Sequence, residues 1–103
     1  MKRKIVAYVP DLLDRSKVAA AGDVSFVNGP DQLAEKAASA GADLVVVDLT
    51  RPGVLDVLPE LSVPVIAFAN HTRRDLMEAA VAAGASQVMA RSAFFGRLEE
   101  LLG

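Results

Sequence analysis

The chain has 103 residues, of which 52% are hydrophobic and 23% charged, and its formal net charge at pH 7 is −2. This length and composition predict one globular domain over residues 1–103 and exclude a disordered chain. The small charge argues against a nucleic-acid partner, and no apolar run approaches the ~18 residues that a membrane span needs. The sequence contains no cysteine and one histidine, which excludes disulfides, thiolate chemistry and multi-histidine metal sites. We therefore expect a cytoplasmic protein that contacts neither nucleic acid nor membrane.

Short apolar runs alternate with segments that carry helix signals, so the sequence predicts a βα unit repeated five times. In chain order the predicted strands are residues 5–9, 24–27, 44–48, 63–68 and 87–90, and the predicted helices are residues 11–21, 30–41, 54–58, 72–84 and 92–102. Capping residues support two of the helix starts. Thr72 with Asp75 approximates a capping pair, and Ser92 is placed to cap the last helix.

The first, third and fourth apolar runs are almost continuous in Val, Ile, Leu, Ala or Phe instead of alternating with polar residues. This pattern is typical of strands in a parallel sheet that helices cover on both faces. With right-handed crossovers, the repeat predicts an α/β fold: a three-layer α/β/α sandwich of the flavodoxin-like (βα)5 type. Its parallel five-stranded sheet is expected to have the strand order 2-1-3-4-5.

The predicted third strand delivers one carboxylate, Asp48, to its C-terminal end, just before a Pro-Gly turn. Ligands and chemistry collect at that edge of open α/β sheets. The same edge is expected to gather further polar loop residues into a pocket, namely Asp11, Asn28, Thr50, Arg51, Asn70, His71, Thr72, Arg73, Arg74, Arg91 and Ser92. An anion site using Arg51, Arg74 and Arg91 is one interpretation, and ordinary polar loop ends are the other. His71 is either a proton acceptor or a solvated loop residue.

Three segments carry a resemblance to a known family: Asp48-Leu49-x-x-Pro52-Gly53, the strand VPVIAF, and Ala82-Ala83-Gly84-Ala85 before the last strand. In these segments the chain resembles the receiver domains of two-component response regulators, the CheY-like superfamily, and the likeness extends over nearly the whole chain. The resemblance implies a module that accepts phosphate on Asp48 with the help of Mg²⁺ and then changes one face to address a partner.

The chain departs from that family where the family holds its metal. An acidic pair at the end of the first strand is replaced by Val9 and Pro10, whose side chains carry no ligand oxygen. Mg²⁺ needs near-octahedral oxygen coordination with one or two carboxylates as anchors. A displaced Asp11 together with Asp48 is the one metal site that the sequence leaves open, and we expect no bound metal or other cofactor.

The family's switch residues are also replaced. Ala69 stands where the family has a hydroxyl, Val88 where it has an aromatic residue, Arg91 where it has lysine and Ser92 where proline follows. Arg91 keeps the charge, and its guanidinium can form a bidentate fork with a carboxylate. One hypothesis is that Arg91 clamps Asp48 in a single state. The other is that Arg91 points into solvent and Asp48 only caps the following turn.

These departures predict a degenerate, stand-alone receiver-like domain that is not an enzyme and has no catalytic residues. We expect a signalling or regulatory protein-interaction module that is not phosphorylated by the usual Mg²⁺-dependent route. Two alternatives stay open: a phosphoacceptor at Asp48 with an incomplete metal site, and a small anion-binding protein. Because no output domain is visible in the sequence, any effect is expected to pass through a protein partner or a homodimer. The resemblance places that contact on the fourth helix, the fifth strand and the last helix, with Phe94 or Phe95 as an exposed anchor unless both rings pack inward.

Overall fold

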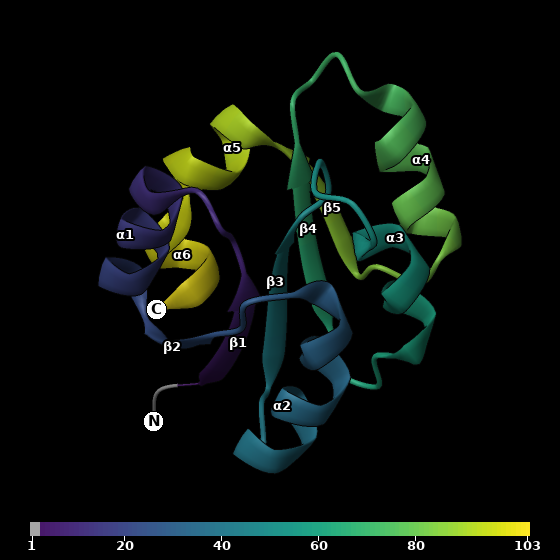
Figure 1. Ribbon diagram of the computed structural model, residues 1–103. Coiled ribbons are helices and arrows are strands. Elements are labelled where there is room, and N and C mark those ends of the chain that lie inside the picture. The colour runs from purple at the N-terminus through teal and green to yellow at the C-terminus, as the bar shows by residue number, and fades with distance from the viewer. Residues whose placement is uncertain (1–2) are drawn as a thin grey trace.

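The computed structural model describes residues 3–103 and contains one five-stranded parallel sheet between two layers of helices (Figure 1). The strands are β1 (Lys4–Tyr8), β2 (Asp23–Phe26), β3 (Leu44–Asp48), β4 (Val65–Ala69) and β5 (Gln87–Ala90). They pair in the order β2-β1-β3-β4-β5, and every pair is parallel. The predicted α/β/α sandwich and its strand order are therefore confirmed.

Within the described residues, six α-helices cover the sheet. They are α1 (Leu12–Ala21), α2 (Leu33–Ala40), α3 (Val54–Val57), α4 (Arg74–Ala82), α5 (Arg91–Gly96) and α6 (Leu98–Leu102), with 3-10 turns at Pro30–Gln32 and Leu58–Glu60 beside α2 and α3. Helices α1, α5 and α6 lie on one face of the sheet, and α2, α3 and α4 lie on the other (Figure 1). None of the described helices is long and apolar enough to cross a membrane.

Successive residues of the central strands enter two different cores. On β3, Leu44 and Val46 pack in the layer of α1, α5 and α6, whereas Val45 and Val47 pack in the layer of α2, α3 and α4. All four side chains are buried. Because side chains alternate between the two faces of a strand, burial on both faces requires an apolar residue at every position. The continuous apolar runs of the sequence therefore follow from the two helical layers.

The last predicted helix, residues 92–102, is divided into α5 and α6. Arg97 leaves the helical region with φ −128° and ψ 24°, directly after Gly96. Glycine is a poor helix former because it loses more backbone freedom than other residues. The break allows the second short helix to turn Leu101 and Leu102 into the core beside α1.

Both predicted helix caps are wrong. Helix α5 already begins at Arg91, so Ser92 lies inside the helix, and neither α4 nor α5 has a side-chain cap. The N-cap residue of α4 is Arg73, whose guanidinium pairs with Asp75 (Nε–Oδ1 3.2 Å). A capping side chain reaches only the first few free amides of its helix, so a shift of the helix start by one residue removes the predicted bond.

Candidate functional site

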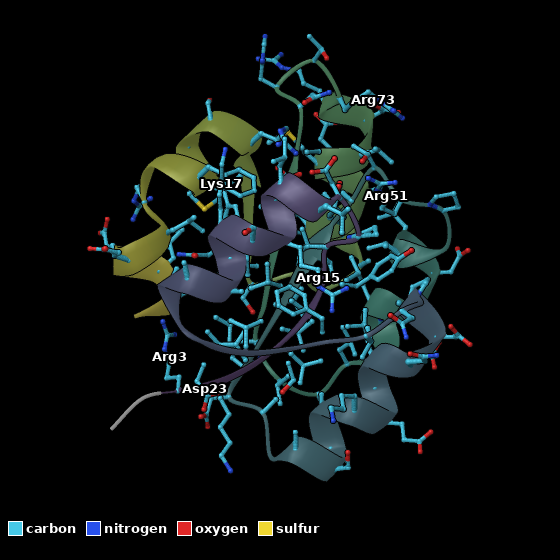
Figure 2. The ribbon with its side chains drawn as sticks, turned by 60° about the vertical axis from the view of Figure 1, so that its left-hand side comes forward. Arg3, Arg15, Lys17, Asp23, Arg51 and Arg73 are labelled. Carbon is cyan, nitrogen blue, oxygen red and sulfur yellow. The ribbon has the colours of Figure 1, made fainter. Side chains whose placement is uncertain are left out.

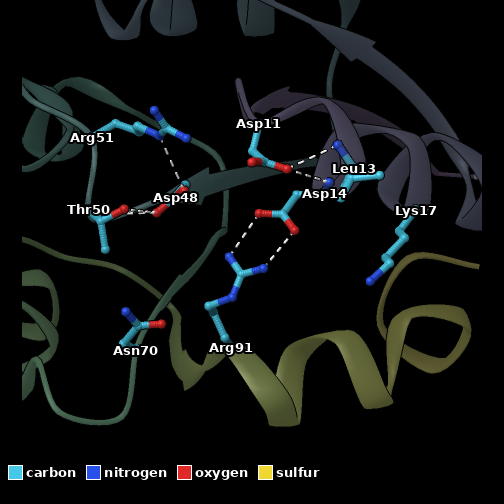
Figure 3. A pocket seen from close by; sticks show the side chains of 9 residues that line it. All are labelled: Asp11, Leu13, Asp14, Lys17, Asp48, Thr50, Arg51, Asn70 and Arg91. Atoms are coloured by element: carbon cyan, nitrogen blue, oxygen red, sulfur yellow. Dashed lines mark hydrogen bonds and ion pairs between the residues drawn. The ribbon is translucent and has the colours of Figure 1, made fainter.

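The carboxyl ends of β1, β3 and β4 and the start of α5 surround a hollow of about 430 Å³ (Figure 3). Nine residues line it: Asp11, Leu13, Asp14, Lys17, Asp48, Thr50, Arg51, Asn70 and Arg91. The structure brings five of the eleven predicted pocket residues to this hollow, together with Asp48. The other six do not line it: His71 and Ser92 line an adjoining hollow, Arg73 and Arg74 lie at the start of α4, and Asn28 and Thr72 lie in loops.

Asp48 ends β3 as a buried carboxylate that is 3% exposed. One oxygen, Oδ1, accepts hydrogen bonds from the amide (3.0 Å) and the hydroxyl (2.6 Å) of Thr50. The other oxygen, Oδ2, lies 3.5 Å from Nε of Arg51. Gly53 follows with φ 85°, a left-handed conformation that lets the chain turn into α3. Asp48 therefore holds the loop that follows it, as one of the two sequence hypotheses states.

Arg91 pairs with Asp14 and not with Asp48, so the predicted Arg91–Asp48 clamp is wrong. The guanidinium donates from both terminal nitrogens to the two oxygens of Asp14, at 2.8 and 2.6 Å. Asp48 is already bonded to its own loop, whereas Asp14 lies on the buried side of α1 with only 4% of its surface exposed. A buried carboxylate needs a partner of opposite charge, and Arg91 supplies it across the sheet edge.

The pKa values of the pair shift as this geometry requires. Hydrogen bonds from Arg91 lower the pKa of the Asp14 carboxyl, and this effect exceeds the opposite effect of burial. The same hydrogen bonds raise the pKa of the Arg91 guanidinium. Both groups are therefore held in their charged forms.

The sequence analysis missed Asp14, although the chain carries a signal for it. Asp14 lies four residues before Val18, so both side chains point to the same side of α1, and both are buried. A carboxylate on the inward stripe of an amphipathic helix implies a cationic partner from another element. The sequence alone does not indicate which of several arginines provides that partner.

The guanidinium of Arg91 lies against an aromatic cluster formed by Phe68, Phe94 and Phe95. The carbon at its centre lies 5.0 Å from the ring centre of Phe95 and 5.7 Å from that of Phe68. Phe94 stacks on Phe68 with 4.6 Å between the ring centres. Phe94 is fully buried, so the prediction that it could anchor a partner is wrong for this ring, while Phe95 is half-buried. Adjacent side chains on a helix point about 100° apart. Here the ring of Phe94 packs against the sheet, and the ring of Phe95 is left partly exposed.

Most carboxylate oxygens of the hollow are already engaged with groups of the protein. Asp11 caps α1, since its Oδ1 accepts from the amides of Leu13 and Asp14 at 3.0 Å each. Asp14 and Asp48 are bonded to arginine and to the Thr50 loop, as described above. Within residues 3–103 no three His, Cys, Asp or Glu side chains are grouped closely enough to hold a metal ion.

The net charge of the hollow also disfavours a cation. Its lining contains three carboxylates, and the cations Lys17, Arg51 and Arg91 are present in equal number. The formal charges therefore cancel, which gives a divalent cation no net attraction. In the predicted site at Asp11 and Asp48, Oδ1 of each residue accepts two hydrogen bonds and Oδ2 of Asp48 lies beside Arg51, so Oδ2 of Asp11 is the one oxygen for which the described residues show no hydrogen bond or ion pair.

No protein-family model matches the chain, and no curated protein is detectably related to it. Solved structures nevertheless share its fold. A response regulator from Hahella chejuensis superposes with a TM-score of 0.81 at 17% identity, covering 97% of this chain and 92% of the other. A response regulator from Thermotoga maritima gives 0.80 at 17% identity over 98% and 94% of the two chains. The chemotaxis response regulator CheY4 of Vibrio cholerae gives 0.80 at 16% identity over 99% and 97%. The chain therefore has the fold of the CheY-like receiver domains of response regulators.

Proposed function

We propose that this chain is a non-catalytic signalling module with a receiver fold, and that it acts by protein contact without Mg²⁺-dependent phosphorylation of Asp48. The observation that carries the proposal is the bonding of the three carboxylates at the sheet edge. Each has a partner within the protein: Asp11 accepts hydrogen bonds at the start of α1, Asp14 pairs with Arg91, and Asp48 accepts hydrogen bonds from Thr50 and lies 3.5 Å from Nε of Arg51.

Phosphoryl transfer to a carboxylate needs an accessible oxygen, a metal and a fixed cation to neutralise charge on the phosphoryl group. In this chain the oxygen Oδ1 of Asp48 already accepts two hydrogen bonds, and Arg51 lies beside Oδ2. Arg91, the one cation at the family's lysine position, is committed to Asp14. The arrangement therefore favours a pocket in which the protein's own side chains take the contacts that a phosphoryl group and its metal would need.

The path by which a receiver would report phosphorylation is also missing. Ala69 ends β4 and is fully buried, and it has no hydroxyl to bond a phosphoryl group. Val88 on β5 is half-buried and has no ring that could change its position. We infer that the contact face built by α4, β5 and α5 is permanently in one form.

That face offers an exposed apolar position. Val81 on α4 is 62% exposed, and β5 is an edge strand with the half-buried Val88 and Met89. A single exposed apolar side chain does not by itself mark a contact surface, so Val81 serves as a probe of the proposed contact, with either a different partner or a second copy. Val81→Lys is a cleaner probe of this contact than a change at buried Phe94, because a lysine at an exposed helix position leaves the core intact.

Amide NMR spectra test the proposal directly. The free protein is titrated with Mg²⁺ and then with beryllofluoride, which mimics a phosphoryl group, and a small phosphodonor is tested in parallel by intact mass. We expect unchanged spectra and no added mass. Shifts centred on Asp48 and Thr50 that spread to Val88, together with a mass gain lost in Asp48→Asn, would establish a phosphoacceptor instead.

A further inference from the structure

A second hollow of about 330 Å³ lies beside the first, between α1, the loop after β4 and the start of α5. It shares Lys17, Asn70 and Arg91 with the first hollow, and its other lining residues are His71, Ser92 and Phe95. The function proposed above uses none of the three added residues. The volume is at the lower end of the range for sites that bind small molecules.

The charge of this hollow differs from that of its neighbour. Three carboxylates line the first hollow, and no carboxylate is among the residues that line the second. Lys17 and Arg91 each bring a positive charge to it. The hydrogen bonds to Asp14 partly neutralise Arg91 and do not involve Lys17. The hollow is therefore a region of positive potential at the carboxyl edge of the sheet.

Lys17 is the cation that remains available for a ligand. Within residues 3–103 no carboxylate oxygen lies within 4.0 Å of its ammonium, whereas Arg51, Arg73 and Arg91 at the same edge are each paired with an aspartate. Its Nζ lies 5.5 Å from the ring centre of Phe95. Figure 2 shows Lys17 on the side of α1 that faces α5, away from Arg51 and Arg73.

Phe95 keeps the ammonium in this place. The ring packs edge-on against Phe68 at 5.3 Å and against Phe94 at 5.0 Å, so it belongs to the aromatic cluster of the core. A cation above an aromatic face is attracted by the ring quadrupole and loses less freedom when a ligand binds. The ammonium is thus partly preorganised, in contrast to an ordinary surface lysine.

Further hydrogen-bonding side chains surround this charge. Ser92 does not cap α5, and its hydroxyl lies on an exposed residue at the hollow. The amide side chain of Asn70 and the imidazole of His71 come from the loop after β4. Hydroxyl, amide and imidazole groups next to an ammonium match the oxygens of a small oxyanion, which accept several hydrogen bonds at once.

We propose that this second hollow binds the oxyanion group of a small metabolite, a phosphate ester or a carboxylate, with Lys17 as its principal cation. The site does not depend on the proposed protein-contact function, and it needs no metal. Bound ligand would bridge α1, the loop after β4 and α5. A small molecule could therefore stabilise these elements against one another.

The test uses the whole chain in a buffer freed of metal ions by a chelating resin, without added EDTA, because a polycarboxylate would compete for the site, and at constant ionic strength. Inorganic phosphate and malonate are titrated separately while amide NMR spectra are recorded, so that the two arms distinguish phosphate from carboxylate ligands. We expect saturable shifts at Lys17, Asn70 and Ser92 with at least one of the two, at a Kd of about 1 mM or tighter. Lys17→Ala should weaken binding about tenfold, the equivalent of one charge-assisted hydrogen bond.

Two further variants make the outcome decisive. Lys36→Ala removes an exposed lysine on α2, on the other face of the sheet, and should leave binding unchanged. Asp48→Asn alters the first hollow and should also leave it unchanged. The proposal is overturned if neither anion gives saturable shifts, if Lys36→Ala weakens binding as much as Lys17→Ala, or if Asp48→Asn abolishes it. A response to Mg²⁺ and beryllofluoride would instead overturn the function proposed above and leave this site standing.

Discussion

A substitution at Arg91 and a substitution at Asp14 should lower the free energy of unfolding by unequal amounts, although both break the same pair. Arg91→Met removes the charge and keeps most of the aliphatic stem, which leaves a carboxylate whose side chain is only 6% exposed without its partner. Removal of one member of a fully buried pair costs about 3–5 kcal/mol. Because the Arg91 side chain is 38% exposed and water can replace part of it, we expect a loss of about 2–3 kcal/mol.

Asp14→Asn should cost less, about 1 kcal/mol, because the guanidinium that it leaves behind reaches solvent and the new amide still offers one oxygen. The double variant Asp14→Asn with Arg91→Met should lose about 1.5 kcal/mol less than the sum of the single losses, since the two side chains interact directly. Urea unfolding at pH 7, with the m-value compared between variants, measures all of these quantities.

The pH dependence gives an independent check. The pKa of Asp14 is lowered in the folded protein, mainly by its hydrogen bonds to Arg91, so its stabilising effect is fully present above the pKa of the unfolded chain. The difference in unfolding free energy between the wild type and Asp14→Asn should therefore be constant from neutral pH to about pH 4. It should shrink below about pH 4, as the pH falls through the lowered folded-state pKa.

The pair Arg97–Glu100 serves as a control, because it is also bidentate, through Nε and Nη2 at 2.9 and 3.2 Å, but lies at exposed positions. Arg97→Met should leave the unfolding free energy unchanged within error. If Arg91→Met cost no more than Asp14→Asn, or if the two losses were simply additive, burial of Asp14 would not be the reason for the pairing, and the argument would be refuted.

Three further changes test local features by urea unfolding. Asp11→Ala should cost about 1 kcal/mol, because it removes both cap hydrogen bonds of α1, while Asp11→Ser should restore most of the loss. Gly53→Ala should cost about 1–2 kcal/mol, since φ is 85° and the new Cβ would lie 3.2 Å from Cγ of Pro30, whereas Gly96→Ala, in open space at the end of α5, should be neutral or slightly stabilising. Phe94→Ala should cost about 3–5 kcal/mol because the ring is fully buried and stacked on Phe68, and a loss below about 1 kcal/mol would contradict that packing.

The sheet could be predicted from the sequence because its signal is distributed over many residues. Burial on both faces imposes an apolar side chain at nearly every position of β1, β3 and β4, and this requirement is visible without any knowledge of partners. Chirality and short connections then leave few strand orders. An error at one residue, such as the strand end at Tyr8 instead of the predicted Val9, changes none of these inferences.

Helix ends and side-chain partners could not be predicted in the same way, because each depends on one residue or one contact. Ser92 and Thr72 are good capping residues in isolation, yet α5 starts two residues too early for Ser92 to be its N-cap and α4 starts one residue too late for Thr72. The partner of Arg91 is separated from it by 77 positions. Asp14 and Asp48 were both chemically suitable, and only the packing of α1 against the sheet decides between them.

The choice of Asp14 over Asp48 as the partner of Arg91 determines what a substitution at Arg91 can do. If Arg91 clamped Asp48, a single change at Arg91 could free the carboxylate for phosphorylation. Because Arg91 bonds Asp14, and Asp48 bonds its own loop, the two carboxylates are held by separate contacts. Releasing either one leaves the other bonded, and the side chains of Val9 and Pro10 still carry no ligand oxygen. On the function proposed above, no single substitution at this edge is therefore expected to give metal-dependent phosphoryl transfer.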